Sequence, residues 1–325
     1  MSKFKNTLLP AFLLTIFLTN CGPKSTEEQF EVIMKSKDPL ERQNISYVLA
    51  NSLDTNAVKL FFGVSHNPVA IESLENMLAR YSEIISTEPT QSEKALQCVQ
   101  LITAPNSLDH DSLKDKKIDL LIHGLNQDFS SMEFENVLIL SAKKYGNEAM
   151  IKLIEAWYQN SYSAPLLHAI QSFENDAVEF LISKMETDTL AIDLLARFGQ
   201  PIVNTMIEKM KDKEQSVRFA AGDVLVQMIK YDPKAVDALT SAIDIGGVGI
   251  IAKNYPFYIR LGQSGTEKIL LKALEAYFNQ VMCVDYLNCG NSELESGATE
   301  IASKNGFYVE RSFGSHYGPI WGSGN

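Results

Sequence analysis

The sequence predicts an all-α protein built from repeated pairs of helices. Apolar residues recur at the i, i+3, i+4, i+7 spacing that lines one face of a helix. No stretch alternates apolar and polar residues for long enough to predict a sheet. The helical stripes return about every 30 residues, a period typical of helical solenoids.

Six apolar stripes define this repeat. The clearest contains Val178, Leu181, Ile182 and Met185. The others are Ile118, Leu121, Ile122 and Leu125; Met150, Leu153, Ile154 and Trp157; Val203, Met206, Ile207 and Met210; Val236, Leu239 and Ile243; and Leu270, Ala273, Leu274 and Tyr277. We expect helical repeats over residues 30–280, with turns that carry glycine and proline between the helices.

The chain opens with a segment typical of a secretory leader rather than of the fold. Lys3 and Lys5 precede an apolar run from Leu8 to Leu18, and Cys21 follows three residues later. The apolar run has about a dozen residues, fewer than the ~20 that a membrane-spanning helix needs. An uncleaved membrane anchor is therefore the weaker interpretation.

Leu18-Thr19-Asn20-Cys21 resembles the bacterial lipobox, in which the cysteine is lipidated and becomes the first residue of the mature protein. Asn20 departs from that pattern, which normally has Gly, Ala or Ser at this position. The resemblance implies a signal peptide over residues 1–20 and a lipidated tether over residues 21–29. The two or three acyl chains of a lipoprotein provide stable attachment, which one chain does not. Gly22 stands where inner-membrane retention would show Asp, so the outer membrane is favoured over the inner one.

The strongest repeat motif lies between Asp212 and Met228. An aspartate in a turn is followed six residues later by an arginine, and paired small residues come next; these signature residues are Asp212, Val217, Arg218, Ala220 and Ala221. This order resembles the HEAT-repeat family. The resemblance implies a right-handed α-α superhelix, a HEAT-like solenoid, and it concerns architecture rather than activity.

The same motif suggests what its residues do. We expect Asp212 to cap a helix, Arg218 to reach an acid on a neighbouring repeat, and the paired alanines to allow close approach at the seam between repeats. The segment from Lys37 to Val48 resembles a degenerate copy, with Glu41 where the arginine would be.

Residues 281–325 differ from the repeats. A helix that runs through Ala302 is expected to cap the array, because a terminal repeat must shield the core from water. The chain then ends in a tail rich in glycine and containing Tyr317 and Trp321. We expect this tail to fold along the last repeats with Trp321 in a groove, and the alternative is a tail that recognises a partner.

The cysteines besides Cys21 are Cys98, Cys283 and Cys289. An exported protein can form disulfides, which makes Cys283 and Cys289 a candidate pair. On a continuous helix these two residues would lie ~9 Å apart along the axis and on different faces, beyond disulfide reach. The bond therefore requires the helix to end near Asp285. Cys98 is expected to be a small buried apolar residue.

The charge of the chain excludes one class of partner. Its net charge is −11, with 40 acidic against 29 basic residues, and the leader contains two of the lysines and no acid. Binding to nucleic acid needs a stripe of Lys and Arg, whereas the short basic runs here are interrupted by acids. We predict no nucleic-acid partner.

Motifs for catalysis and metal binding are absent from the sequence. None of the five histidines is followed by glutamate, and no zinc helix, nucleophile elbow or phosphate loop occurs. Asp109-His110-Asp111 departs from the calcium-loop pattern and is interpreted as a polar loop. Gly247-Val248-Gly249 follows a predicted helix rather than a strand, so it is interpreted as a turn. We predict no metal and no cofactor.

These observations favour a lipid-anchored, non-catalytic scaffold that binds unidentified protein partners in the cell envelope. The alternative is a lyase-like or metal-using envelope enzyme on a HEAT frame, similar to the bilin-lyase branch of these repeats. A candidate binding face comprises Trp157, Tyr158 and Tyr162, because the aromatic residues around the predicted loop at 158–162 crowd together.

Overall fold

The computed structural model describes residues 24–106, 109, 111–127, 131–160, 163–228, 230–231, 247–308 and 318–323. Within these ranges the chain forms 17 α-helices and one short 3₁₀ helix, and it forms no strand. The all-α prediction is confirmed for this part of the chain. The chain divides into two compact units, of which unit 1 ends at Phe173 and unit 2 begins at Glu174.

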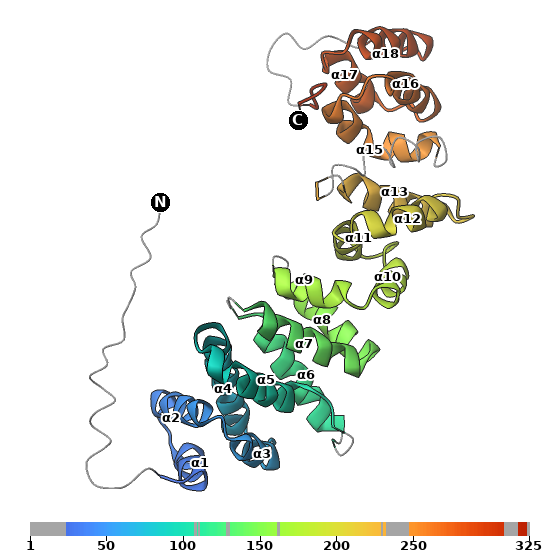
Figure 1. Ribbon diagram of the computed structural model, residues 1–325. Helices are drawn as coiled ribbons and strands as arrows, with labels where there is room; N and C mark the ends of the chain where they lie inside the picture. The colour runs from blue at the N-terminus through green and yellow to red at the C-terminus, as the bar shows by residue number, and fades with distance from the viewer. Residues whose placement is uncertain are drawn as a thin grey trace, which may run out of the picture. The chain divides into compact units, whose positions relative to one another are not determined.

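The helices of unit 1 alternate along the chain between two layers (Figure 1). In one layer α2, α4, α6 and α8 pack side by side, and in the other α1, α3, α5, α7 and α9 do so. The helices are α1 (Thr26–Lys35), α2 (Pro39–Ser52), α3 (Thr55–Gly63), α4 (Pro68–Thr87), α5 (Pro89–Thr103), α6 (Asp111–Leu125), α7 (Met132–Tyr145), α8 (Asn147–Gln159) and α9 (Ala164–Gln171).

Unit 2 has the same kind of packing between neighbours. Here α11 packs on α13 and α13 on α15, while α16 packs on α18 and α17 on α18. The helices are α10 (Asn175–Ile182), α11 (Thr189–Ala196), the 3₁₀ helix η2 (Gln200–Ile202), α12 (Val203–Lys209), α13 (Gln215–Met228), α15 (Val248–Leu261), α16 (Glu267–Ala276), α17 (Gln280–Asn288) and α18 (Ser292–Lys304).

Local sequence explains where many of these helices begin. The side chains of Asp38 and Asn67 accept hydrogen bonds from backbone N–H groups in the first turns of α2 and α4. Proline follows each of them, where its missing N–H costs nothing and its fixed φ suits a helix. Ser25 and Glu28 form a reciprocal capping box at the start of α1.

The predicted stripes form most of the core. All four residues of the α8 stripe are buried. In α6, α10 and α12 the isoleucine that is third in each stripe is only half-buried, while the other members are buried. Tyr277, which ends the α16 stripe, is exposed. The stripe at residues 236–243 lies outside the described residues.

Polar contacts repeat with the same period as the apolar stripes. Hydrogen bonds join next-but-one helices through side chains 30 to 33 residues apart: Arg42 to Glu72, Lys152 to Asp119 and His168 to Glu135 in unit 1, and Lys253 to Asp223 and Tyr255 to Asp285 in unit 2. Because this separation equals the repeat period, each bond joins two helices that hold the same position in successive pairs. Each unit is therefore consistent with a repeat-like array, whereas the superhelix and its handedness stay predictions.

Candidate interaction site

Two of the predicted functional residues lie outside the described residues. These are Cys21, the predicted lipid attachment point, and Tyr162 of the predicted binding face. The signal peptide over residues 1–20 lies outside them as well. The anchor therefore stays a prediction from the sequence.

The other two aromatic residues of the predicted binding face differ in exposure. Trp157 is 1 % exposed and belongs to the core of unit 1. Tyr158 is half-buried, and its ring meets the edge of the Trp157 ring with centroids 6.1 Å apart. Trp157 ends the α8 stripe, and the periodicity that places the stripe inside also places the indole there. Its burial removes Trp157 from the candidate binding face.

The signature residues of the repeat motif form a local clamp at the start of α13. The Asp212 carboxylate accepts a hydrogen bond from the N–H of Glu214 at 3.1 Å. The Arg218 guanidinium donates to the carbonyl oxygens of Asp212 and Lys213, at 2.8 and 2.9 Å. Side chains on a helix lean toward its N-terminus, so Arg218 reaches the turn before its own helix. The expectation that Arg218 reaches a neighbouring acid is not met by these contacts.

A similar clamp occurs in the degenerate copy of the motif. There the sequence motif placed the arginine's position at Glu41, whereas the residue that forms the clamp is Arg42. Arg42, next to Glu41, donates to the carbonyl of Ser36, six residues before it. Arg218 donates to Asp212 across the same separation. Arg42 also pairs with Glu72 of α4, so the same side chain serves both the turn and the next helix pair.

The seam between α13 and α15 is closest at a residue that the motif did not single out. Ala220 and Ala221 are buried, Val217 is half-buried, and Gly222 follows them. A Cβ atom on Gly222 would lie 2.9 Å from Cγ2 of Ile250. A side chain at position 222 would therefore force Ile250 to move, and the run of small residues was the signal for this close approach.

The candidate disulfide is not formed. Helix α17 continues through Asn288, past the point where it would have to end, and Cys283 and Cys289 are both free and buried. The Cys283 thiol donates to the carbonyl of Ala298, and the Cys289 thiol donates to that of Tyr286. Burial raises the pKa of each thiol, which favours its protonated form. Cys98 is buried, with its thiol pKa also raised by burial.

The described carboxylates near residue 110, those of Asp109 and Asp111, each pair with a lysine and do not come together as a group of metal ligands. Asp109 pairs with Lys117 at 2.7 Å, and Asp111 pairs with Lys114 at the start of α6. His110 lies outside the described residues. No group of three His, Cys, Asp or Glu side chains in the described ranges could hold a metal ion.

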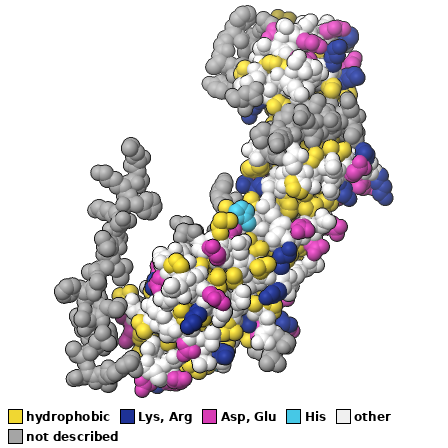
Figure 2. Space-filling model, viewed as in Figure 1, with side chains coloured by type: hydrophobic (Ala, Val, Ile, Leu, Met, Phe, Trp, Pro, Cys, Tyr) yellow, Lys and Arg dark blue, Asp and Glu magenta, His cyan; other side chains and the backbone are white. Residues whose placement is uncertain are grey.

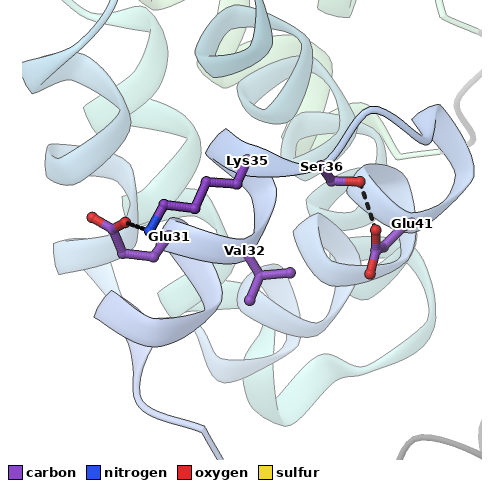
Figure 3. A pocket seen from close by; sticks show the side chains of 5 residues that line it. All are labelled: Glu31, Val32, Lys35, Ser36 and Glu41. Atoms are coloured by element: carbon purple, nitrogen blue, oxygen red, sulfur yellow. Dashed lines mark hydrogen bonds and ion pairs between the residues drawn. The ribbon is translucent and has the colours of Figure 1, made fainter.

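A pocket of about 310 Å³ lies where α1 meets α2 (Figure 3). Its lining residues are Glu31, Val32, Lys35, Ser36 and Glu41. The charged and polar groups contact one another: Lys35 pairs with Glu31 at 2.7 Å, and Ser36 donates to Glu41 at 2.6 Å. Because the Lys35–Glu31 pair is well exposed, the pocket offers little desolvated surface to a ligand.

A stacked pair of phenylalanines, with two exposed apolar side chains near it in sequence, lies at one end of the α17–α18 pair. Phe278 stacks on Phe307, with ring centroids 4.8 Å apart and planes at 30°. Val281 and Tyr308, their neighbours in sequence, are 65 % and 83 % exposed. We call these four residues the C-terminal aromatic patch. The repeat pattern did not point to it, although the aromatic residues just before α17 and just after α18 were a signal for it in the sequence.

The face of unit 1 that Figure 2 draws is mixed in character. Figure 2 shows acidic and basic side chains interspersed with hydrophobic ones over unit 1.

None of the helices in the described part of the chain combines the length and the apolar character that a membrane crossing requires. Searches of protein-family profiles and of curated proteins found no match to this chain.

Proposed function

We propose that this chain is a lipid-anchored helical-repeat scaffold, HEAT-like in architecture, that binds protein partners in the bacterial cell envelope without catalysing a reaction. Cys21 is the proposed anchor, with the outer membrane favoured. The observation that carries the binding proposal is the C-terminal aromatic patch. Repeat arrays present extended surfaces that suit such binding.

The patch has the properties of a binding hot spot. Aromatic residues are enriched in the cores of protein interfaces and supply most of the binding energy when a partner excludes water from them. The Phe278–Phe307 stack contributes about 0.5–1.5 kcal/mol beyond the burial of its area. It also holds the two rings in place before a partner arrives, which lowers the entropic cost of binding. Val281 and Tyr308, near the two rings in sequence, expose further apolar side chains.

Membrane attachment is tested at the cysteine. In the bacterial host, Cys21→Ala should abolish labelling by a palmitate analogue and release the protein from the membrane fraction, because no acyl chain is attached. Lys24→Ala, in the same tether, is the matched control and should change neither. Unchanged fractionation and labelling of the Cys21 variant would contradict the anchor.

Partner binding is tested by placing a photoreactive phenylalanine analogue at Tyr308. We expect a crosslink to a second protein in intact cells, with a yield that falls several-fold when Phe307→Ala removes the stacked ring. An analogue at Thr299, exposed on α18 but outside the patch, is the control. Equal crosslinking from positions 308 and 299, or none from either, would refute binding through the patch.

A further inference from the structure

The last described residues, 318–323, return to unit 2 and lie across the carboxyl ends of two helices. The N–H of Gly322 donates to the carbonyl of Ile259 in the last turn of α15 at 3.0 Å. The N–H of Trp321 donates to the carbonyl of Cys289, just after α17, at 2.8 Å. Carbonyl groups at the ends of helices lack partners within the helix. The tail supplies donors that these two ends need.

Two glycines shape the contact. A Cβ atom on Gly262 would lie only 2.5 Å from the backbone N and Cα of Gly322. These are backbone atoms, which cannot turn aside as the end of a side chain could. Gly262 and Gly322 also have φ values of +62° and +72°, a region that favours glycine. The close approach therefore requires glycine at position 262, whereas at position 322 the backbone conformation favours glycine and an added Cβ would meet no atom within 4 Å.

The side chains of the tail divide into those that face the helices and those that face solvent. Pro319 is buried and Trp321 is half-buried. The indole Nε1 of Trp321 would lie 3.4 Å from a Cβ atom on Gly262, so the ring lies beside the end of α15. Ile320, between them, is 44 % exposed. The segment ends in a turn, in which the N–H of Ser323 donates to the carbonyl of Ile320 at 3.2 Å. Two backbone hydrogen bonds and the side chains of Pro319 and Trp321 hold it against the helices.

We propose that the surface formed by the carboxyl ends of α15 and α17 is a peptide-binding site, occupied in cis by residues 318–323 of the same chain. Its ligand is a short segment that ends in a turn, in which a proline and a tryptophan face the helix ends and a glycine in a left-handed conformation follows the tryptophan. The tail acts as a strap over Cys289, whose carbonyl it binds and whose thiol is buried. The proposal is independent of the lipid anchor and of the aromatic patch.

The strap is tested through the accessibility of Cys289 in the full-length protein. A thiol reagent is applied at pH 8, and mass spectrometry reports the labelling rate of each cysteine. Trp321→Ala should raise the rate at Cys289 at least tenfold and leave that at Cys98, in unit 1, unchanged. Ile320→Ala, which removes an exposed side chain from the same segment, should leave the rate at Cys289 as in the wild type.

Rescue in trans separates a binding site from a merely stabilising contact. A synthetic peptide with the sequence of residues 318–323, added at millimolar concentration to match a tethered tail, should restore protection of Cys289 in the Trp321→Ala protein. Equal labelling of the Trp321→Ala and Ile320→Ala proteins, or failure of the peptide to protect Cys289, would overturn the proposal.

A second pair of variants tests the same site from the helix side. Gly262→Ala should displace the tail and make Trp fluorescence several-fold more sensitive to iodide, since the only other tryptophan, Trp157, is 1 % exposed. Gly265→Ala has a comparable positive φ of +95° but no atom within 4 Å of the added Cβ, so it controls for backbone strain. Equal quenching in the two variants would also overturn the proposal.

Discussion

At the scale of single residues, the burial of a charged side chain decides how much its ion pair contributes to stability. The side chains of Lys117 and Asp109 are 5 % and 7 % exposed and lie 2.7 Å apart. The Lys117 ammonium also donates to the carbonyl of Ala104 and lies 5.0 Å from the centre of the Phe62 ring. A buried ion pair is costly to form, and removing one partner leaves the other charge without compensation.

We therefore expect Lys117→Met to lower the free energy of unfolding by about 3–5 kcal/mol, the range for breaking a buried pair. Lys114→Met, on the same helix, removes an exposed pair with Asp111 and should change stability by no more than about 0.5 kcal/mol. Urea unfolding at pH 7 measures both. Equal effects of the two substitutions would contradict the importance of burial here.

At the scale of elements, the helices approach each other as closely as their smallest residues permit. Gly222 on α13 faces Ile250 on α15, and Gly297 on α18 faces Leu271 on α16. Ile250 is β-branched and has few alternative rotamers, so it cannot easily yield to an added atom. Leu271 would meet an added methyl with the ends of its flexible side chain. Both glycines therefore mark places where an added methyl group would force a neighbouring side chain to move.

Gly222→Ala should lower the free energy of unfolding by about 1–3 kcal/mol, because overpacking outweighs the better helix propensity of alanine. Gly63→Ala, at the end of α3, introduces a Cβ with no atom within 4 Å and should stabilise by about 0.4–1 kcal/mol. Thermal unfolding of both variants gives the comparison. Stabilisation of the protein by Gly222→Ala would contradict the close packing of Gly222 against Ile250.

At the scale of the whole molecule, both units bury tyrosines. Tyr81 in unit 1 and Tyr258 and Tyr286 in unit 2 are almost completely buried. Burial raises the pKa of each phenol above its ordinary value of 10.0. Folding therefore keeps these groups protonated at a pH where the unfolded chain would ionise them.

The sign of the pH dependence follows from these raised pKa values. The contribution of each tyrosine to stability is complete below pH 10 and falls above it, by about 1.4 kcal/mol per tyrosine for each pH unit. We expect the unfolding temperature to fall steeply above pH 10, together with the appearance of tyrosinate absorbance.

Tyr258→Phe tests this origin of the alkaline transition. The Tyr258 hydroxyl has no hydrogen-bond partner among the described residues, so its removal should cost little at pH 7. The variant should lose less stability than the wild type between pH 10 and pH 11. An alkaline transition of the same steepness in both proteins would exclude Tyr258 as a contributor.

The all-α class and the repeat period followed from the sequence because both are local. A helix places every third or fourth residue on one face, so the stripes in α6, α8, α10 and α12 are visible without tertiary information. The caps at Asp38 and Asn67 are local as well. The period of about 30 residues then reappears in the polar contacts that join next-but-one helices.

The sequence by itself determined an acidic, all-α chain with helical stripes at a regular period, and it predicted a lipid anchor. Only the tertiary structure decided that Trp157 is buried, that Arg218 clamps its own turn, and that Phe278 stacks on Phe307. It also decided that the tail passes Gly262. Periodicity reports the geometry of a single helix, whereas these outcomes depend on how side chains distant in sequence share the same space.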